Sequence, residues 1–345
     1  MMKEINSLTY ENLRGAIENI GEKSFRADQI FRFFHQRDGK DILDISQIPF
    51  ELREKLSSIY KVSDMKILRK YNSQKDDTTK YLYVLDDNNI IESVVMKYPH
   101  GYSQCISTQI GCRMGCSFCA STKEGLIRNL SAAEMLNQIY TAEKDIGVRI
   151  SNVVLMGSGE PLDNIDNVLD FFNIINHEKG RNISLRSITL STCGIVPGIY
   201  RLAKENIPIT LSISLHSPFD EKRQEIMPIA KGYSLKELMD SLNEYVKITN
   251  RRITFEYTLI EGVNDSENEA KEIAKLLKGL LSHVNLIPLN PIKEYDKGRP
   301  DKDHVLKFQN LLQRFGVQTT IRKEMGSDIS ASCGQLRRSV LEDQD

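Results

Sequence analysis

The stretch "GCRMGCSFCAST", residues 111–122, places Cys112, Cys116 and Cys119 within eight positions. A structural zinc site usually closes with four ligands, and an iron–sulfur cubane likewise has four irons, which thiolates normally bind. Three thiolates without an obvious fourth indicate either a ligand elsewhere in the chain or a coordination position that is left open. A zinc site that recruits Cys105 is the main alternative to an open cluster site.

The composition is that of an ordinary globular protein, with 345 residues of which 40% are hydrophobic and 27% charged. Its 46 basic and 47 acidic side chains nearly cancel, so a polyanion could be bound only by a local patch. We find no secretory signal and no apolar run long enough to span a membrane. Six cysteines are too few for a disulfide scaffold, so we expect a reduced cytoplasmic setting in which clustered cysteines serve metal binding or catalysis. We also expect a monomer.

Within the first hundred residues, the spacing of apolar residues changes from a helical to an alternating pattern near residue 65. Apolar spacing predicts helices over 24–37, with Ser24 as a cap, and over 49–60. Alternating residues after position 66 predict a β-hairpin that turns at 87–89.

Strand, loop and helix then alternate six times, and "SAAE" predicts a capping box between Ser131 and Glu134. Six such units imply a parallel sheet, either doubly wound or curled into a partial barrel. The predicted strands span 104–110, 151–157, 186–192, 208–216, 252–260 and 283–290. We expect four parts: a helical accessory domain (1–65), a β-hairpin segment with Glu92 (66–103), an α/β core (104–325) and a C-terminal segment with Cys333 (326–345).

Polar clusters follow several predicted strands, where the loops of a parallel sheet build a binding site. Any one of these side chains alone is more simply explained as a core hydroxyl, a satisfied histidine or a glycine turn. Their shared position at strand ends is the stronger signal. The candidate ligand-binding residues are Gly159, Glu160, Ser191, Ser214, Leu215, His216 and Asn290.

The C-x3-C-x2-C spacing, with Phe118 before the last cysteine, resembles the radical S-adenosylmethionine (SAM) superfamily. The resemblance implies a [4Fe–4S] cluster on the three cysteines, with the fourth iron free for SAM. One electron from the cluster would cleave SAM to a 5′-deoxyadenosyl radical. The backbone around Gly159 and the Glu160 carboxylate would then face the SAM amine, and the other candidates its ribose, carboxylate or adenine.

Further stretches resemble the RlmN/Cfr family of radical SAM RNA methyltransferases over nearly the whole chain. They include "CISTQIGCRMGCSFCAS" (105–121), "MGSGEPLDN" (156–164), "SLHSP" (214–218), "VNLIPLNP" (284–291) and "SCGQLR" (332–337). The resemblance implies a partial (β/α)6 barrel. "GEPLDN" and "NLIPLNP" favour the adenine-C2 branch over the C8 branch. "STCG" departs from the commoner "STSG", and we interpret its Cys193 as a buried small residue.

The family chemistry implies roles for residues outside the cluster loop. A first SAM would methylate Cys333, and the radical from a second SAM would remove hydrogen from that methyl group. The resulting carbon radical would add to adenine C2, and Cys105 would resolve the adduct by forming a disulfide with Cys333. Glu92 matches the proposed proton acceptor, and whether Glu92 or Cys105 takes the C2 proton stays open.

The implied partners are 23S rRNA, at its peptidyl-transferase region, certain tRNAs next to the anticodon, and an electron donor of the flavodoxin or ferredoxin type. Candidate phosphate contacts are basic residues within 23–40 and the pairs Arg251–Arg252, Arg322–Lys323 and Arg337–Arg338; a solvated surface is the alternative for each. The competing functions are a C8 methyltransferase, another radical SAM enzyme such as an activase, and a zinc-stabilised RNA-binding module.

Overall fold

The computed structural model describes residues 2–295 and 297–336. Its centre is a ten-stranded sheet in the order β14-β13-β12-β11-β10-β9-β6-β5-β4-β3. Seven neighbouring strands of this sheet pair in parallel. They are β6 (Gly101–Cys105), β9 (Ile150–Leu155), β10 (Ile188–Thr192), β11 (Thr210–Ser214), β12 (Ile253–Leu259), β13 (Ser282–Pro288) and β14 (Thr319–Ile321).

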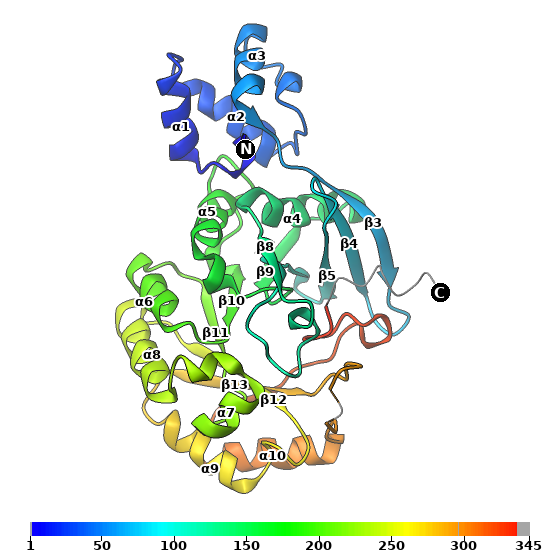
Figure 1. The fold of residues 1–345 in the computed structure, drawn as a ribbon, viewed down its shortest axis with the longest axis vertical. Helices are drawn as coiled ribbons and strands as arrows, with labels where there is room; N and C mark the ends of the chain where they lie inside the picture. The colour runs from blue at the N-terminus through cyan, green and yellow to red at the C-terminus, as the bar shows by residue number, and fades with distance from the viewer. Residues whose placement is uncertain (1, 296, 337–345) are drawn as a thin grey trace.

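Each parallel strand lies beside the next parallel strand along the chain. This order excludes the doubly wound alternative, in which the strand order reverses at a switch point, and it is the order of a partial barrel. Helices α6, α8, α9 and α10 lie on the outside of the curved sheet (Figure 1). The expected partial barrel is therefore confirmed, with β14 as one parallel strand more than the six that were predicted.

The predicted helices are present, with one error at a cap. Ser24 precedes α2, but its side chain makes no capping hydrogen bond, so that prediction is wrong. The capping box between Ser131 and Glu134 is confirmed at the start of α4. The helices are α1 (Tyr10–Asn19), α2 (Phe25–His35), α3 (Phe50–Ile59), α4 (Ala132–Ile146), α5 (Ile165–Asn176), α6 (Val196–Glu205), α7 (Asp220–Ile226), α8 (Leu235–Thr249), α9 (Glu267–Leu276) and α10 (Lys302–Arg314).

An antiparallel extension continues the barrel sheet at β6. The predicted hairpin is formed by β4 (Thr78–Leu85) and β5 (Ile90–Tyr98), and β5 also pairs with β6. The structure adds an outer strand that was not predicted, β3 (Met65–Asn72). The hairpin segment thus shares one sheet with the barrel, which places Glu92 of β5 one strand away from the core.

The helical N-terminal part packs on the barrel through aromatic and charged side chains. His35 of α2 bonds Tyr140 of α4 through Nδ1 over 3.2 Å. Lys179, in the loop after α5, donates to Asp28 over 2.8 Å and to the Tyr10 hydroxyl over 2.9 Å. Burial is nearly complete at His35, which is 2% exposed, so the N-terminal helices and the core share a packed interface.

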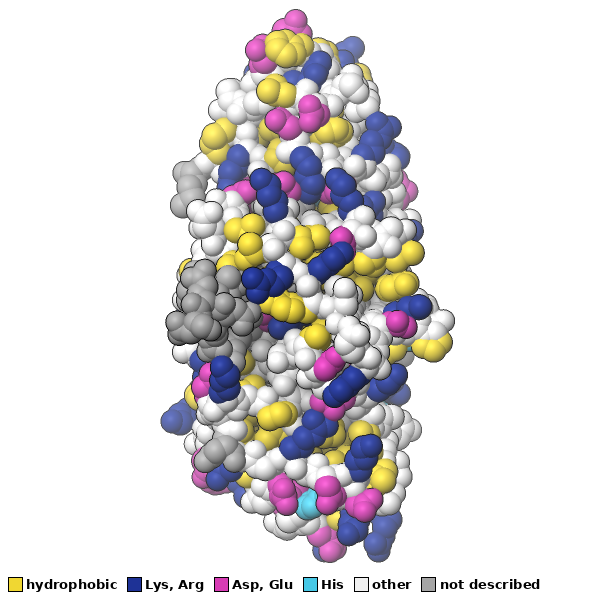
Figure 2. Space-filling view, turned by 90° about the vertical axis from the view of Figure 1, so that its right-hand side faces the viewer, with side chains coloured by type: hydrophobic (Ala, Val, Ile, Leu, Met, Phe, Trp, Pro, Cys, Tyr) yellow, Lys and Arg dark blue, Asp and Glu magenta, His cyan; other side chains and the backbone are white. Residues whose placement is uncertain are grey.

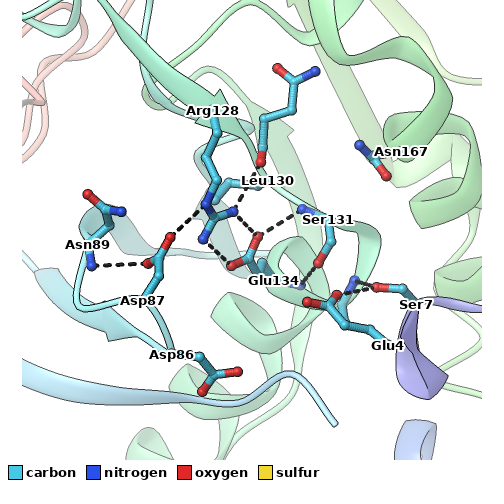
Figure 3. A network of polar contacts seen from close by, with 12 residues as sticks. Glu4, Ser7, Asp86, Asp87, Asn89, Arg128, Leu130, Ser131, Glu134 and Asn167 are labelled. Carbon is cyan, nitrogen blue, oxygen red and sulfur yellow. Dashed lines mark hydrogen bonds and ion pairs between the residues drawn. The ribbon is translucent and has the colours of Figure 1, made fainter. Parts of the chain in front are cut away.

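Arg128 joins the hairpin turn to the start of α4 (Figure 3). It follows the cluster loop on β8 (Leu126–Asn129). Its Nε donates to Asp87 over 2.7 Å, and its two terminal nitrogens donate to Glu134 over 2.8 Å each. Burial acts to raise the pKa of Asp87, but hydrogen bonds from Arg128 and Asn89 lower it to about 2. This network fixes the hairpin against the same loop that carries the three cysteines.

Candidate active site

The carboxyl ends of the parallel strands surround an open cavity of about 920 Å³. The structure brings most of the predicted site residues together in its wall. Those that line it are Cys112, Cys116, Cys119, Gly159, Glu160, Ser191, Ser214, His216, Asn290 and Cys333.

The cysteine loop connects β7 (Gln109–Gly111) to β8 and is held by backbone contacts. The Cys112 N–H donates to the Gly125 carbonyl over 3.0 Å. The Thr122 hydroxyl lies within 3.1 Å of the Cys116 carbonyl and 2.9 Å of the Cys119 carbonyl. These contacts present three sulfurs to one cavity without using the thiols themselves.

The environment of these thiols suits a cationic iron–sulfur cluster. Burial raises the pKa of Cys112 to about 12 and that of Cys116 well above its ordinary value, and the neighbouring cysteines raise the latter further. Three buried, mutually repelling thiolates need a positive partner, which a cluster supplies. Cys105 packs in a different apolar group, beside Val94 and Met325, which argues against a four-cysteine zinc site.

The "GSGEP" loop brings a carboxylate to the cavity. Gly159 has φ +107°, and a Cβ there would lie 2.6 Å from the Gln109 side chain, so glycine is required. Glu160 is 3% exposed, and its two oxygens accept the N–H groups of Cys193 over 2.7 Å and Leu162 over 3.0 Å. Burial raises the pKa of Glu160, so a bound ammonium group would be well matched. Cys193 is buried, as predicted.

His216 is held as a neutral ring in a left-handed backbone conformation, with φ 54°. Its Nδ1 accepts the N–H of Thr258 over 2.9 Å, which leaves the proton on Nε2. Burial, then the nearby Arg223, lowers the pKa of His216 to about 3. The adjacent Leu215 packs its side chain into the main hydrophobic core, so the structure does not bring that side chain to the cavity.

The C-terminal segment returns across the strand ends and carries Cys333 into the cavity wall. Gly334 has φ +82°, a left-handed backbone conformation that glycine adopts readily. Three hydrogen bonds hold this stretch: Asn290 Nδ2 to the Cys333 carbonyl (2.9 Å), Ala120 N–H to the Gly334 carbonyl (2.8 Å) and Ser121 Oγ to the Leu336 carbonyl (2.6 Å). Two of these donors directly follow Cys119, so the segment is attached to the cluster loop.

Cys105 and Glu92 do not line the cavity itself. Cys105 pairs with Val94 across β5 and β6, and paired residues share a sheet face. Glu92 lies two positions before Val94 and so is on the same face, where its carboxylate is 3.7 Å from the Lys80 ammonium. This face is covered by Met325 and by two residues of the C-terminal segment, Ala331 and Leu336, which lie on either side of Cys333 in the sequence.

Two basic pairs are not where a phosphate contact would be expected. Arg322 lines the cavity beside Cys333 and lies 3.6 Å from Glu256. Arg251 and Arg252 precede β12 and so lie at the opposite end of the strands. Arg337–Arg338 lies outside the described residues. Sequence reasoning missed the inward role of Arg322, because the strand that it follows, β14, has only three residues and gives no sequence signal.

A further basic stretch, also missed, lies on and next to the outer strand β3. The exposed cations here are Lys61, Lys66, Arg69 and Lys70. Figure 2 faces this side of the molecule and shows Lys and Arg side chains interleaved with apolar and acidic ones. Across the described part of the chain, no helix has the length and apolar character needed to cross a membrane.

Comparison with known proteins agrees with this geometry. Residues 106–277 match the model of the radical SAM superfamily, and residues 3–62 match that of the ribosomal RNA large subunit methyltransferase N-terminal domain. The solved structure of a radical SAM methyltransferase from Sphaerobacter thermophilus is similar over 98% of this chain and 100% of its own, with 39% identity and a TM-score of 0.90.

Curated relatives match over nearly their whole length. A probable dual-specificity RNA methyltransferase RlmN from Clostridioides difficile is 51% identical over 97% of both chains. A relative of the same name from Clostridium acetobutylicum is 51% identical over 100% of this chain and 99% of its own. Identity at this level and coverage shows common family membership. The chain belongs to the RlmN family of radical SAM RNA methyltransferases.

Proposed function

We propose that this radical SAM RNA methyltransferase transfers a methyl group to C2 of an adenosine, both in the peptidyl-transferase region of 23S rRNA and next to the anticodon of certain tRNAs. The observation that carries the proposal is the position of Cys333, whose segment is attached to both the cluster loop and the loop after β13. A methyl acceptor must reach the SAM cavity, and Cys333 lines it.

The cofactor assignment follows from the same cavity. Cys112, Cys116 and Cys119 would hold a [4Fe–4S] cluster, which supplies the electron that cleaves SAM. Glu160 would pair with the SAM ammonium group, and the Nε2–H of His216 would donate to an acceptor on the ligand. Two SAM molecules would be used per turnover, one as the methyl donor and one as the radical source.

Cys105 and Glu92 would complete the reaction from the neighbouring sheet face. Once the methylene carbon is bonded to adenine C2, the radical adduct would lose the C2 proton and one electron, which the oxidised cluster would accept. The Cys105 thiolate would then attack the Cys333 sulfur, forming a disulfide as the sulfur–methylene bond breaks. The electron pair would remain on the methylene carbon, which takes a proton to become the methyl group. Glu92, buried beside Lys80, is the candidate base for the C2 proton.

The four parts of the chain would divide this work. Residues 1–65 would bind RNA, 66–103 would supply Glu92, 104–325 would bind the cluster and SAM, and 326–345 would carry the methyl acceptor. We propose a cytoplasmic monomer that is reduced by a donor of the flavodoxin or ferredoxin type.

Nucleoside mass spectrometry of RNA from a strain that lacks the activity tests this function. After incubation with reconstituted protein, SAM and reductant, we expect 2-methyladenosine in both 23S rRNA and tRNA. Formation of 8-methyladenosine would instead support the C8 alternative. Deoxyadenosine release without any methylated adenosine would contradict the proposal and favour another radical SAM reaction.

A further inference from the structure

Gln109 joins the base of the cysteine loop to the loop that carries Glu160. It lies on β7, three residues before Cys112, and is 0% exposed. Its amide nitrogen donates to the Asn129 side chain on β8 over 2.8 Å and to the Asp163 carboxylate over 2.9 Å. Its amide oxygen accepts the backbone N–H of Glu160 over 2.8 Å. One buried amide therefore connects both strands that bound the cysteine loop with the "GSGEP" loop.

These contacts hold the backbone of Glu160 from both sides. Gln109 accepts its N–H directly. Asp163, whose carboxylate accepts from Gln109, donates its own N–H to the Glu160 carbonyl over 3.0 Å. The two chains are also in close contact, because a Cβ at Gly159 would lie 2.6 Å from the Gln109 Cβ. The place at which Glu160 enters the cavity wall thus depends on the Gln109 side chain.

A second attachment holds the same loop independently of Gln109. The Asn164 side chain donates to the Thr108 carbonyl over 2.9 Å and to the Leu130 carbonyl over 2.8 Å, and Asn164 is itself buried. A change at Gln109 should therefore shift Glu160 without releasing the whole loop.

We propose that Gln109 is a positioning residue, which fixes the Glu160 carboxylate relative to the three cluster cysteines. This inference rests on the proposed role of Glu160 in binding the SAM ammonium group. Glu160 lines the cavity and Gln109 does not, so Gln109 acts through Glu160 rather than by touching the ligand. SAM would bind the cluster and Glu160 together, so its affinity depends on the separation between the cysteine loop and that carboxylate.

Calorimetry with S-adenosylhomocysteine measures this effect without turnover. The probe has the amino acid and nucleoside parts of SAM but no methyl group to transfer and no sulfonium to cleave. It is titrated into the reconstituted full-length protein, and iron analysis gives the fraction of molecules that carry a cluster. We expect Gln109→Leu to retain its iron and to bind the probe about tenfold more weakly or worse, as is typical when the partner of a ligand-binding group is removed.

A double-mutant cycle shows whether the effect passes through Glu160. Glu160→Gln alone should weaken binding of the probe. In the Glu160→Gln protein, Gln109→Leu should have little further effect, because the charged group that Gln109 positions is already gone. Equal weakening in both backgrounds would overturn the proposal, since Gln109 would then act on the cavity independently of Glu160. Unchanged affinity in Gln109→Leu would overturn it as well.

A rescue experiment exchanges the donor and the acceptor of one hydrogen bond. Gln109→Glu sets a second carboxylate against that of Asp163 and should weaken binding of the probe. Adding Asp163→Asn supplies an amide that can donate to the new carboxylate and still accept from Arg113, its ion-pair partner, so most of the affinity should return. If Gln109→Leu cannot hold a cluster, this pair decides the question, and a lack of recovery overturns the proposal.

Gln104→Leu is the matched control. Gln104 on β6 is also 0% exposed, but its amide donates to the Ser93 hydroxyl over 2.9 Å and the Gln138 carbonyl over 2.8 Å, away from the "GSGEP" loop. This variant should unfold at lower denaturant concentration and bind the probe as the wild type does. An equal loss of affinity in this variant would contradict a specific role for Gln109.

The role of Glu160 and the inference about Gln109 fail in different ways. If Glu160→Gln binds the probe as tightly as the wild type, the proposed contact of Glu160 with the ammonium group fails, and the inference fails with it. If Glu160→Gln weakens binding but Gln109→Leu does not, only the inference about Gln109 fails.

Discussion

Asn290 and Cys333, 43 residues apart, are joined by a hydrogen bond of 2.9 Å from the Asn290 side chain to the Cys333 backbone carbonyl. Both residues line the cavity beside the three cluster cysteines. The position of the proposed methyl acceptor therefore depends on the loop after β13. A change that loosens the C-terminal segment should impair methyl transfer more than SAM binding.

Asp328 provides a remote test of this dependence. Its carboxylate accepts the Ser73 hydroxyl over 2.7 Å and the Gln74 N–H over 2.8 Å, which fastens the segment to the β3–β4 hairpin. We expect Asp328→Ala to increase hydrogen exchange in residues 326–336 and to reduce methylation of Cys333. SAM binding, measured by calorimetry, should change little. Glu178→Ala, an exposed control, should alter none of these; unchanged exchange in Asp328→Ala would show that this attachment is not needed.

The cluster assignment predicts a difference between neighbouring cysteines. Replacing Cys112, Cys116 or Cys119 with Ala should remove most of the iron and abolish SAM cleavage, because two thiolates hold a cubane poorly. Cys193→Ser preserves a small buried side chain and should retain both iron and cleavage. Iron analysis and deoxyadenosine yield measure the outcome. Wild-type cleavage in any of the three Ala variants would refute the three-thiolate site.

RNA binding by the N-terminal helices is better tested by neutralising exposed basic side chains than by deleting the helices. Removal of residues 1–60 would expose the buried interface at Tyr140, so we prefer the combined change of the exposed cations Lys23, Arg32 and Arg37 to Gln. Affinity for RNA should fall and its dependence on salt should weaken, because phosphate contacts are lost. Deoxyadenosine formation without RNA should be unaffected.

A matched triple change, Lys204→Gln, Lys278→Gln and Lys307→Gln, removes equal charge from exposed positions on or next to the outer helices. It should leave the salt dependence close to that of the wild type. If the dependence of RNA affinity on salt concentration weakened equally in both triple variants, the cause would be a nonspecific effect of net charge rather than the loss of a binding surface.

His35 predicts how stability changes with pH. Burial, reinforced by Arg181 and His177, lowers the pKa of His35 to about 3, against an unfolded value of about 6.5. The unfolded chain therefore binds the proton first as the pH falls, and stability is lost below about pH 6.5, by about 1.4 kcal/mol per pH unit for one proton. We expect His35→Gln to reduce this loss of unfolding free energy between pH 7 and pH 5, measured by denaturant titration. The control His100→Gln changes an exposed histidine and should leave the pH dependence of stability unchanged.

Much of this architecture could be predicted because buried parallel strands are apolar and their ends carry chemistry. "VVLMG" and "LSISLH" signal strands by composition alone, so the partial barrel and its cavity followed. Strand β3 was missed because its outward edge is mostly polar, and β14 because three residues give no periodicity. Ser24 failed as a cap because its own backbone is helical, with φ −53° and ψ −33°, whereas a capping residue is usually extended.

The site could be predicted only where a motif marked it. The cluster cysteines and Glu160 stand in such motifs, and the structure brings them together. The pairing of Arg322 with Glu256 joins two residues 66 positions apart, one just after β14 and the other on β12, and only the fold reveals it. Leu215 was selected for its place between Ser214 and His216, but alternation along the chain turns its side chain into the core.

The central claim, that Cys333 carries the methyl group and Cys105 resolves the adduct, is tested most directly by the covalent state of RNA after the reaction. The Cys105→Ala variant, given SAM, reductant and RNA, should accumulate a protein–RNA conjugate, seen on a denaturing gel as a shift that nuclease removes. Cys333→Ala should give no conjugate, because no sulfur can accept the methyl group. If neither variant traps RNA, or both do so equally, the assignment of the two cysteines is contradicted.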